Sequence, residues 1–487
     1  MNRLAPALSC RCFLRLDVRG WAARAVAAAI LVPLFAIGLW ATPAHATTIE
    51  RIVSPDGIEA WLVREPAVPL VTVDFAFIGG SAQDPIGKAG TAFLMTSLLD
   101  EGAGDFDQQA FDDRLDRKAV QLSFHADRDH ISGTLRTLVE NRDEAFDDLR
   151  LALTAPRFDA AVVEINRAQV LSALRRQQTS PTDLAALRWW STAFADHPYG
   201  RPVAGTLESV PTITVDDLRT YQHRVLARSN LKVAVVGDID VETAKAMLDR
   251  IFGALPAKAE LTPVEAVVPQ GVGQHISVDL DVPQTVIDFG CPGIPRKDPD
   301  FFAAYIVNDI LGGGTFSSRL YREVREKRGL AYSIYDSLLW FDHTAVFFGS
   351  TATRADRADQ TVALIDKEIH RLAEEGPTAD ELTKAKAYLN SSFMLNLDTS
   401  GKVAGLLVQL QLDNLGIDYI ERRPQMIAAV TLDDTRRVAK RLLDSGLLFT
   451  VVGRATGLAS SAGASAGAAP ALMAPGGSPP GPGGELR

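Results

Sequence analysis

The chain has 487 residues, of which 47% are hydrophobic and 23% are charged, so it is long enough for at least two globular domains and too apolar for a disordered protein. Its 60 acidic and 50 basic residues give a formal net charge of −10. This excess of negative charge argues against nucleic acid or an anionic membrane surface as a partner.

The chain begins with the pattern of a secretory signal peptide, which we predict at residues 1–46. Five arginines and one aspartate precede an apolar run at residues 25–41, and Ala44-His45-Ala46 then matches the small-x-small pattern of a cleavage site. The alternative is an uncleaved anchor, because an apolar run of this length almost spans a bilayer. Cleavage would change the net charge from −10 to −14 and release a periplasmic protein. No later apolar run is long enough to cross a membrane, so we expect no membrane partner after cleavage.

Cysteine usage agrees with a fold that depends on its hydrophobic core. Cys10 and Cys12 lie in the predicted signal peptide, and Cys291 is the third cysteine of the chain. An exported protein with a single cysteine has no internal disulfide.

Two parts of the sequence repeat each other, which predicts a duplicated domain. The stretch "VPLVTVDFAFIGGSAQDP" begins at Val68 and "VPQTVIDFGCPGIPRKDP" begins at Val282, an offset of 214 residues. Further along, "ITVDDLRTY" from Ile213 matches "VTLDDTRRV" from Val430, at an offset of 217. Matches that keep their order and nearly the same offset indicate internal duplication.

Strand and helix patterns alternate within each repeat. Alternating strands open each half, as at residues 72–80 and 285–290, and helical patterns follow, as at residues 111–118 and 357–376. A valine-rich strand closes each half. The fold class predicted from this mixed order is α+β, with a sheet covered by helices, built twice.

The boundaries follow from the same patterns. We predict the first sandwich at residues 47–253 and the second at residues 275–453. Residues 254–274 contain three prolines and little periodicity, so they are predicted to be a linker. The Gly/Ala/Ser/Pro-rich residues 454–487 cannot bury apolar surface and are expected to be a disordered tail.

The stretch "LGGGTFSSRLYREVREKRGLAYS", residues 311–333, contains an arginine that no neighbour neutralises. A helix is predicted at residues 319–328. Within it we expect the ion pairs Arg319–Glu323 and Arg322–Glu326, each with four-residue spacing. Arg325 has no carboxylate three or four residues away, so its charge is left for something outside the helix.

A tyrosine is expected beside that arginine. Gly329 ends the predicted helix, and the strand that follows should return Tyr332 to the vicinity of Arg325. We expect Leu330, Tyr332 and Ile334 on one face of this strand. A guanidinium and a phenol that converge can donate hydrogen bonds to a carbonyl or an oxyanion. The alternative is a solvated arginine and a half-buried strand tyrosine.

The glycine triplet is the second candidate binding element. Gly312, Gly313 and Gly314, with Thr315, are predicted to bind substrate by exposing backbone to an extended peptide. The alternative is a loop that needs glycine for positive φ angles.

These residues closely resemble the second-half signature of the pitrilysin/insulinase zinc peptidases, a family that includes mitochondrial processing peptidase and bacterial two-subunit peptidases. "HPYGRPVAGT" at residues 197–206 matches another family stretch, and the resemblance covers about residues 50–453. It implies a duplicated α+β sandwich whose halves form a clamshell around an unfolded peptide. It also implies that Arg325 and Tyr332, at the family's spacing of seven residues, contact substrate opposite the zinc.

The zinc motif of that family is absent from the first half of this chain. The family's His-x-x-Glu-His block falls on "GTAFLMTSLLDEG", where Phe93 and Ser97 stand at the histidine positions and Thr96 stands at the glutamate position. Ser172 and Ala173 stand where the third ligand, a glutamate, is expected. We therefore expect no metal in this chain.

The remaining histidines do not suggest a replacement metal site. His125 and His130, in "FHADRDH", are the only close pair. Treated as a strand, this stretch points them to opposite faces, so they do not converge on a metal and a solvated strand face is expected.

Three hypotheses remain. The leading one is the substrate-binding, non-zinc subunit of a two-chain periplasmic peptidase, in which a homologous partner supplies the zinc and cuts a peptide substrate. The alternatives are a proteolytically inactive scaffold and a peptide-binding holdase of the same fold. Arg325 and Tyr332 count against the scaffold, which has no need of them.

Overall fold

The computed structural model describes residues 48–454, and residues 49–454 of these belong to one compact unit. The predicted signal peptide and the predicted tail beyond residue 454 lie outside the described residues, as does the side chain of Thr315. Within the described part, no helix combines the length and the apolar character needed to cross a membrane.

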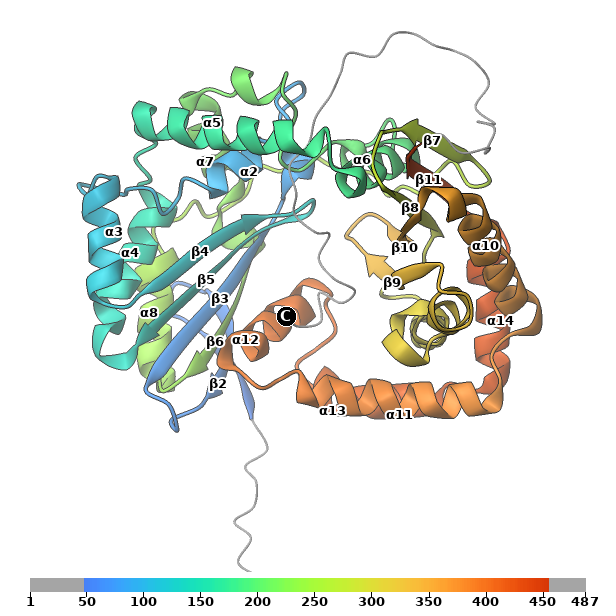
Figure 1. Ribbon diagram of the computed structural model, residues 1–487. Helices are drawn as coiled ribbons and strands as arrows, with labels where there is room; N and C mark the ends of the chain where they lie inside the picture. Colours follow the sequence, from blue (N-terminus) through green and yellow to red (C-terminus); the bar gives the residue numbers. More distant parts are fainter. Residues whose placement is uncertain (1–47, 455–487) are drawn as a thin grey trace, which may run out of the picture. The chain divides into compact units, whose positions relative to one another are not determined.

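Two mixed sheets form the framework, one in each half (Figure 1). In the first sheet the spatial order of strands is β1 (Ile49–Val53), β2 (Glu59–Arg64), β6 (Leu231–Gly237), β3 (Leu70–Ile78), β5 (His130–Leu138) and β4 (Gln121–Ala126). In the second sheet it is β7 (His275–Asp279), β11 (Leu448–Gly453), β8 (Gln284–Pro292), β10 (Ala345–Arg354) and β9 (Ala331–Trp340). The order β7-β11-β8-β10-β9 repeats β2-β6-β3-β5-β4, and β2–β6 and β7–β11 are the parallel pairs in each. The predicted duplication is confirmed at the level of topology.

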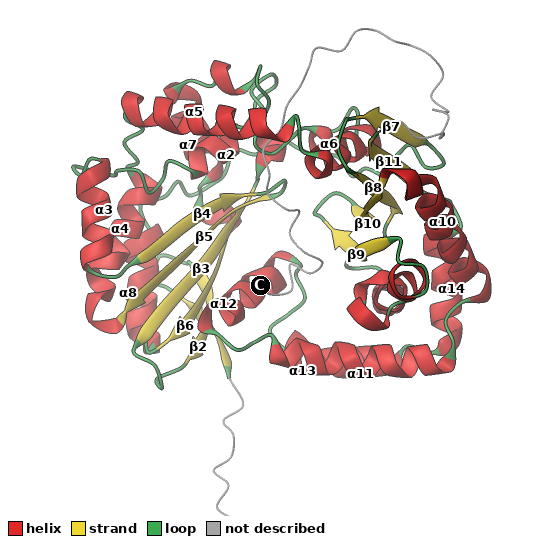
Figure 2. Ribbon diagram, in the orientation of Figure 1, coloured by secondary structure: helices red, strands yellow, loops and turns green. Residues whose placement is uncertain are grey.

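Helices cover the sheets (Figure 2). The helices of the first half are α2 (Thr91–Thr96), α3 (Gln108–Arg117), α4 (Arg142–Thr154), α5 (Ala160–Gln177), α6 (Pro181–Ala193), α7 (Val215–Val225) and α8 (Val241–Phe252). Those of the second half are α9 (Phe301–Asn308), α10 (Ala358–Glu375), α11 (Ala379–Leu395), α12 (Ser400–Leu412), α13 (Tyr419–Ala429) and α14 (Leu432–Leu443). The helices predicted at residues 111–118 and 357–376 are confirmed as α3 and α10.

The repeated motif "T-x-x-D" has the same local role in both halves. At the start of α7, the Thr214 backbone N–H donates to Asp217 (2.7 Å), and the Asp217 N–H donates to the Thr214 hydroxyl (3.2 Å). Thr431 and Asp434 form the same capping box at the start of α14, with distances of 3.0 and 3.1 Å. A capping box satisfies backbone donors that the helix itself leaves open, so these two residues fix where each helix begins.

The two halves exchange a helix, which the sequence did not predict. One face of each sheet is buried by helices of its own half, but α6 packs on β8 and β11 of the second sheet, and α12 packs on β3 and β6 of the first. Trp189 of α6 is fully buried there and donates its indole N–H to the Leu448 carbonyl (3.1 Å). The two sandwiches therefore share their cores and are not independent.

The segment between the halves is held in place by both of them. The predicted linker, residues 254–274, contains neither helix nor strand. Thr262 exchanges hydrogen bonds with the Gln83 side chain of the first half, and the Val267 N–H donates to the His343 carbonyl of the second half (2.9 Å). Hydrogen bonds therefore fix this segment to both halves of the protein.

Equivalent hairpin turns of the two halves meet around His130. His130 lies between Asp127 of its own turn (3.6 Å) and Asp342 of the β9–β10 turn (3.5 Å), and its side chain is only 13% exposed. Asp129 of the same turn accepts a hydrogen bond from the Tyr199 hydroxyl. The predicted solvated strand face is therefore wrong for His130, because β4 ends at Ala126 and residues 127–129 form a turn that the other half covers.

The charge of His130 should make the contact between these turns depend on pH. Burial alone lowers the pKa of His130, but the hydrogen bonds and charges of Asp127 and Asp342 outweigh burial and hold this pKa well above its usual value. Asp129 and Asp413 are further carboxyls that act on this imidazole. Because the pKa of His130 is higher in the folded chain than in the unfolded chain, protonation of His130 stabilises the fold. This stabilisation is complete at pH values below the unfolded pKa of about 6.5, and it is lost as the pH rises through the folded-state pKa.

We expect His130→Gln to lower the free energy of unfolding at neutral pH and to reduce its decline toward alkaline pH. Urea unfolding from pH 6 to pH 10 measures both effects. His125→Gln is the matched control, because His125 is exposed on the adjacent strand. Parallel pH profiles for the wild type and His130→Gln would show that His130 does not carry this pH dependence.

Candidate functional site

Arg325 contacts two tyrosine rings in the second half. Its guanidinium carbon is 4.5 Å from the ring centre of Tyr332 and 4.9 Å from that of Tyr321. Among the described residues, Arg325 has no ion-pair partner. Cation–π contacts hold a guanidinium by its faces, so the N–H groups at its edge stay free to donate. The structure thus brings together the two residues that the sequence analysis paired.

An irregular helix end and a strand bulge create this contact. Residues Tyr321–Glu326 form a π-helical turn, and Gly329 then adopts a positive φ of 58°. The Leu330 N–H donates back to the Val324 carbonyl (2.9 Å), which closes the helix end. The chain therefore reverses at Gly329 and brings Tyr332 back to Arg325.

The expected faces of β9 are wrong at Tyr332. Leu330 and Ile334 are buried, whereas Tyr332 is 83% exposed. Thr351 pairs with Ile334 while Thr353 pairs with Ala331, so β9 contains one extra residue between these pairs. Such a β-bulge turns the following side chains to the other face, and here it presents Tyr332 to solvent.

The arginines before Arg325 have structural partners that differ from those predicted. Arg319 donates to Glu381 through two nitrogens, each at 2.8 Å, instead of pairing with Glu323. Arg322 lies 3.6 Å from the same Glu381 and not beside Glu326. Glu323 instead accepts from Lys327 and Arg328, both at 2.6 Å, and these contacts lower its pKa to about 2. Four-residue spacing failed as a guide because α11 supplies Glu381 from outside the segment.

The glycine triplet is packed inside the second half rather than exposed. Gly312 and Gly314 are buried, and none of the three glycines has a positive φ, so neither the exposed-backbone hypothesis nor the positive-φ alternative describes this turn. A Cβ on Gly312 would lie 2.4 Å from the Asp336 carboxylate, and one on Gly314 would lie 2.6 Å from the Asp309 carbonyl. Glycine is required here for close packing. Contact of Gly312–Gly314 or Thr315 with a peptide stays a prediction.

Asp336 explains why this turn lies so close to β9. The Asn308 side chain donates to the Asp336 carboxylate (2.5 Å), and the Gly312 and Gly313 N–H groups face the same carboxylate. Burial and the nearby Asp309 raise the pKa of Asp336 well above its usual range, although those two N–H groups oppose the shift. The triplet thus fixes the strand on which Tyr332 stands.

The positions that correspond to the family's zinc ligands hold side chains that satisfy their own helix. The Thr96 hydroxyl donates to the Phe93 carbonyl and the Ser97 hydroxyl donates to the Leu94 carbonyl, each at 2.9 Å. Phe93 packs against the core of the first half. Ser172 of α5 accepts a hydrogen bond from Arg176 (3.0 Å). Within residues 48–454, no three His, Cys, Asp or Glu side chains are grouped to hold a metal ion, and these residues do not fit zinc.

Sequence reasoning missed two aromatic side chains of this site, Tyr321, which contacts Arg325, and Phe316, which contacts Tyr321. Tyr321 stands four residues before it, a spacing that places side chains on one helix face and could have revealed the contact. Phe316 is 70% exposed, and its ring meets that of Tyr321 edge-on, with centroids 5.2 Å apart.

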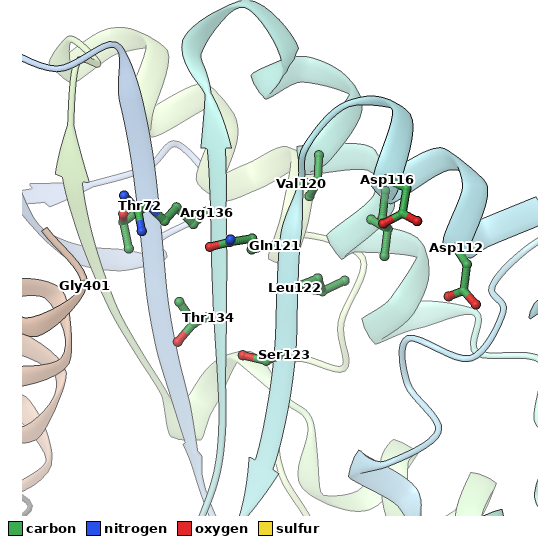
Figure 3. A pocket seen from close by; sticks show the side chains of 11 residues that line it. Thr72, Asp112, Asp116, Val120, Gln121, Leu122, Ser123, Thr134, Arg136 and Gly401 are labelled. Carbon is green, nitrogen blue, oxygen red and sulfur yellow. The ribbon is translucent and has the colours of Figure 1, made fainter. Parts of the chain in front are cut away.

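A separate pocket of about 580 Å³ borders β4, at the edge of the first sheet (Figure 3). Gln121, Ser123 and Thr134 line it from β4 and β5, and Asp112 and Asp116 line it from α3. No other strand pairs with β4 besides β5 in the described residues. An open strand edge flanked by polar side chains can accept the backbone of an extended peptide.

Comparisons with known proteins identify the family. A model of the insulinase peptidases, family M16, matches residues 61–207, and a model of the M16 inactive domain matches residues 212–389. An uncharacterized zinc protease of Streptomyces coelicolor is 27% identical over 417 residues, which cover 83% of this chain and 90% of that protein.

Two further relatives are named as a non-peptidase homologue and as an inactive domain. The non-peptidase homologue YmxG of Helicobacter pylori is 29% identical over 334 residues, 68% of this chain and 77% of that protein. The crystal structure of a peptidase M16 inactive domain from Pseudomonas fluorescens superposes with a TM-score of 0.79 at 26% identity, over 84% of this chain and 98% of that one. The chain is therefore a member of the M16 insulinase family of peptidases, and one in which residues 48–454 do not form the family's zinc site.

Proposed function

We propose that this chain is the peptide-binding, non-zinc subunit of a two-chain peptidase that acts on peptides or unfolded polypeptides after export to the periplasm. The observation that carries the proposal is Arg325, whose guanidinium contacts two tyrosine rings and has no ion-pair partner among the described residues. A side chain held in this way costs little further entropy when it binds a ligand. In a scaffold, such a positively charged group would serve no purpose.

The role of each residue follows from its chemistry. Arg325 and the Tyr332 hydroxyl are donors for one peptide carbonyl, and their hydrogen bonds strengthen as that oxygen becomes an oxyanion. The first half of this chain has no residues for a zinc-bound water, so a homologous partner with the His-x-x-Glu-His motif supplies the metal. The open edge of β4 offers a second place for extended backbone.

The test uses the chain from Thr47 onward, purified alone and mixed with an M16 partner that carries the zinc motif. We expect no stoichiometric zinc by elemental analysis, binding of a fluorescein-labelled unfolded casein by anisotropy, and no cleavage by the chain alone. Mixing should produce cleavage that neither chain shows by itself.

Three results would contradict this proposal in different ways. One zinc per chain with cleavage by the chain alone would make it a complete peptidase. Casein binding without cleavage in any mixture would favour a holdase. A chain that does not bind casein and does not activate a partner would favour a scaffold.

A further inference from the structure

Four side chains form a continuous strip on the surface of the second half, which we call the aromatic strip: Phe316, Tyr321, Arg325 and Tyr332. The Phe316 ring contacts that of Tyr321 at 5.2 Å, the Tyr321 ring contacts the Arg325 guanidinium at 4.9 Å, and the guanidinium contacts the Tyr332 ring at 4.5 Å. Tyr321 is 9% exposed and supports the strip from beneath. Phe316 and Tyr332 are the exposed ends of this strip.

Exposure alone does not make Phe316 a binding residue. Single apolar side chains on a surface are ordinary, and Ile86 is even more exposed, at 99%. Phe316 differs because its ring contacts Tyr321, which in turn contacts Arg325, the residue proposed to bind the peptide carbonyl. The Phe316 side chain packs in none of the hydrophobic clusters of the described residues, so the core does not require a phenyl ring at this position.

The dimensions of the strip match a short piece of extended peptide. The two contacts at Tyr321 place the Phe316 ring no more than about 10 Å from the Arg325 guanidinium, which is about three residues of an extended strand. A peptide carbonyl held by Arg325 therefore lies within three residues of a side chain that reaches Phe316.

We infer that Phe316 binds a large apolar side chain of the peptide, aromatic or aliphatic, within three residues of the carbonyl that Arg325 and Tyr332 hold. This inference rests on the proposed peptide-binding function and adds a preference to it. Two aromatic rings meeting edge-on or offset attract each other beyond their buried area, so phenylalanine is the best-matched occupant. Arg325 contacts the peptide backbone and so contributes affinity for any peptide sequence. Phe316 contacts a side chain and so makes the chain selective among peptide sequences.

The experiment compares two fluorescein-labelled peptides of Gly, Ser and Gln residues that differ only in a single central Phe or Ala. The wild-type chain should bind the Phe peptide at least about tenfold more tightly by anisotropy, as burial of one phenyl side chain predicts. Phe316→Ala should bind both peptides equally, near the wild-type affinity for the Ala peptide, and Phe316→Leu should restore part of the preference. Arg325→Ala should weaken both peptides by the same factor and keep the preference.

Tyr388→Ala is the matched control, because Tyr388 is a partly exposed aromatic side chain on α11 outside the strip. If Phe316→Ala keeps the wild-type preference for Phe, this inference is wrong while peptide binding by the chain stands. If the wild-type chain binds neither peptide, the proposed function and this inference fail together.

Discussion

Replacing Arg325 by alanine should lower kcat of the reconstituted two-chain peptidase by about a hundredfold to a thousandfold. Loss of one donor to a developing oxyanion typically costs about 2.7–4 kcal/mol of transition-state stabilisation. Tyr332→Phe should have an effect in the same direction, because it removes the hydroxyl and keeps the ring over the guanidinium. The double variant should lose less than the sum of the two, since both donors serve one oxygen. Steady-state kinetics on a quenched-fluorescence peptide measures each of these effects.

Arg322→Ala is the matched control for Arg325→Ala. Arg322 is 46% exposed and shares Glu381 with Arg319, whose two hydrogen bonds to that carboxylate remain in the variant. An exposed ion pair of this kind contributes about 0–1 kcal/mol to the free energy of unfolding. We expect Arg322→Ala to leave kcat unchanged. Equal kcat values for the Arg325 and Arg322 variants would remove Arg325 from the reaction and favour the scaffold alternative.

Neither half of the chain should fold when it is expressed alone. Without the second half, the first sheet lacks α12, in which Leu406, Leu407, Val408 and Leu410 are all buried. Burial of four such side chains stabilises a fold by about 6–12 kcal/mol, and the whole stability of a domain is only about 5–15 kcal/mol. The second sheet likewise lacks α6 and the buried Trp189.

Expression of residues 47–253 and 275–453 separately and together tests this prediction. Each piece alone should be insoluble or unfold without a cooperative transition, and the two pieces together should recover one cooperative transition in urea. Trp189→Ala in the intact chain should cost about 3–5 kcal/mol of unfolding free energy, as loss of a buried tryptophan does. Two separately purified halves that each unfold cooperatively would show that the exchanged helices are dispensable.

Cys291 is not expected to complicate such measurements. It is buried, its thiol lies 3.3 Å from the Leu442 carbonyl, and burial raises the pKa of this thiol to about 12. Little thiolate forms at neutral pH, so reaction with oxidants or with labelling reagents should be slow in the folded chain.

Local patterns by themselves determined several features of this protein. The duplication was visible because equivalent strands and helix starts repeat their residues, as in the capping boxes at Thr214 and Thr431. The missing zinc ligands were visible because a motif on one helix turn is a property of adjacent residues. The neighbourhood of Arg325 and Tyr332 was accessible for the same reason, since seven residues and one glycine turn separate them.

Only the tertiary structure decided which surfaces those elements meet. Nothing within α6 or α12 indicates that each covers the sheet of the other half, because an apolar helix face does not encode its partner. Arg319 pairs with Glu381, which is 62 residues away in the sequence, and not with Glu323. His130 is buried because the turn that contains Asp342 packs against it from the other half. One extra residue in β9 turned Tyr332 to solvent. Close packing against Asp336, and not a positive φ angle, is the reason for glycine at Gly312. Burial and charge pairing are set by groups that are distant along the chain, so these features exist only once the two halves have folded onto each other.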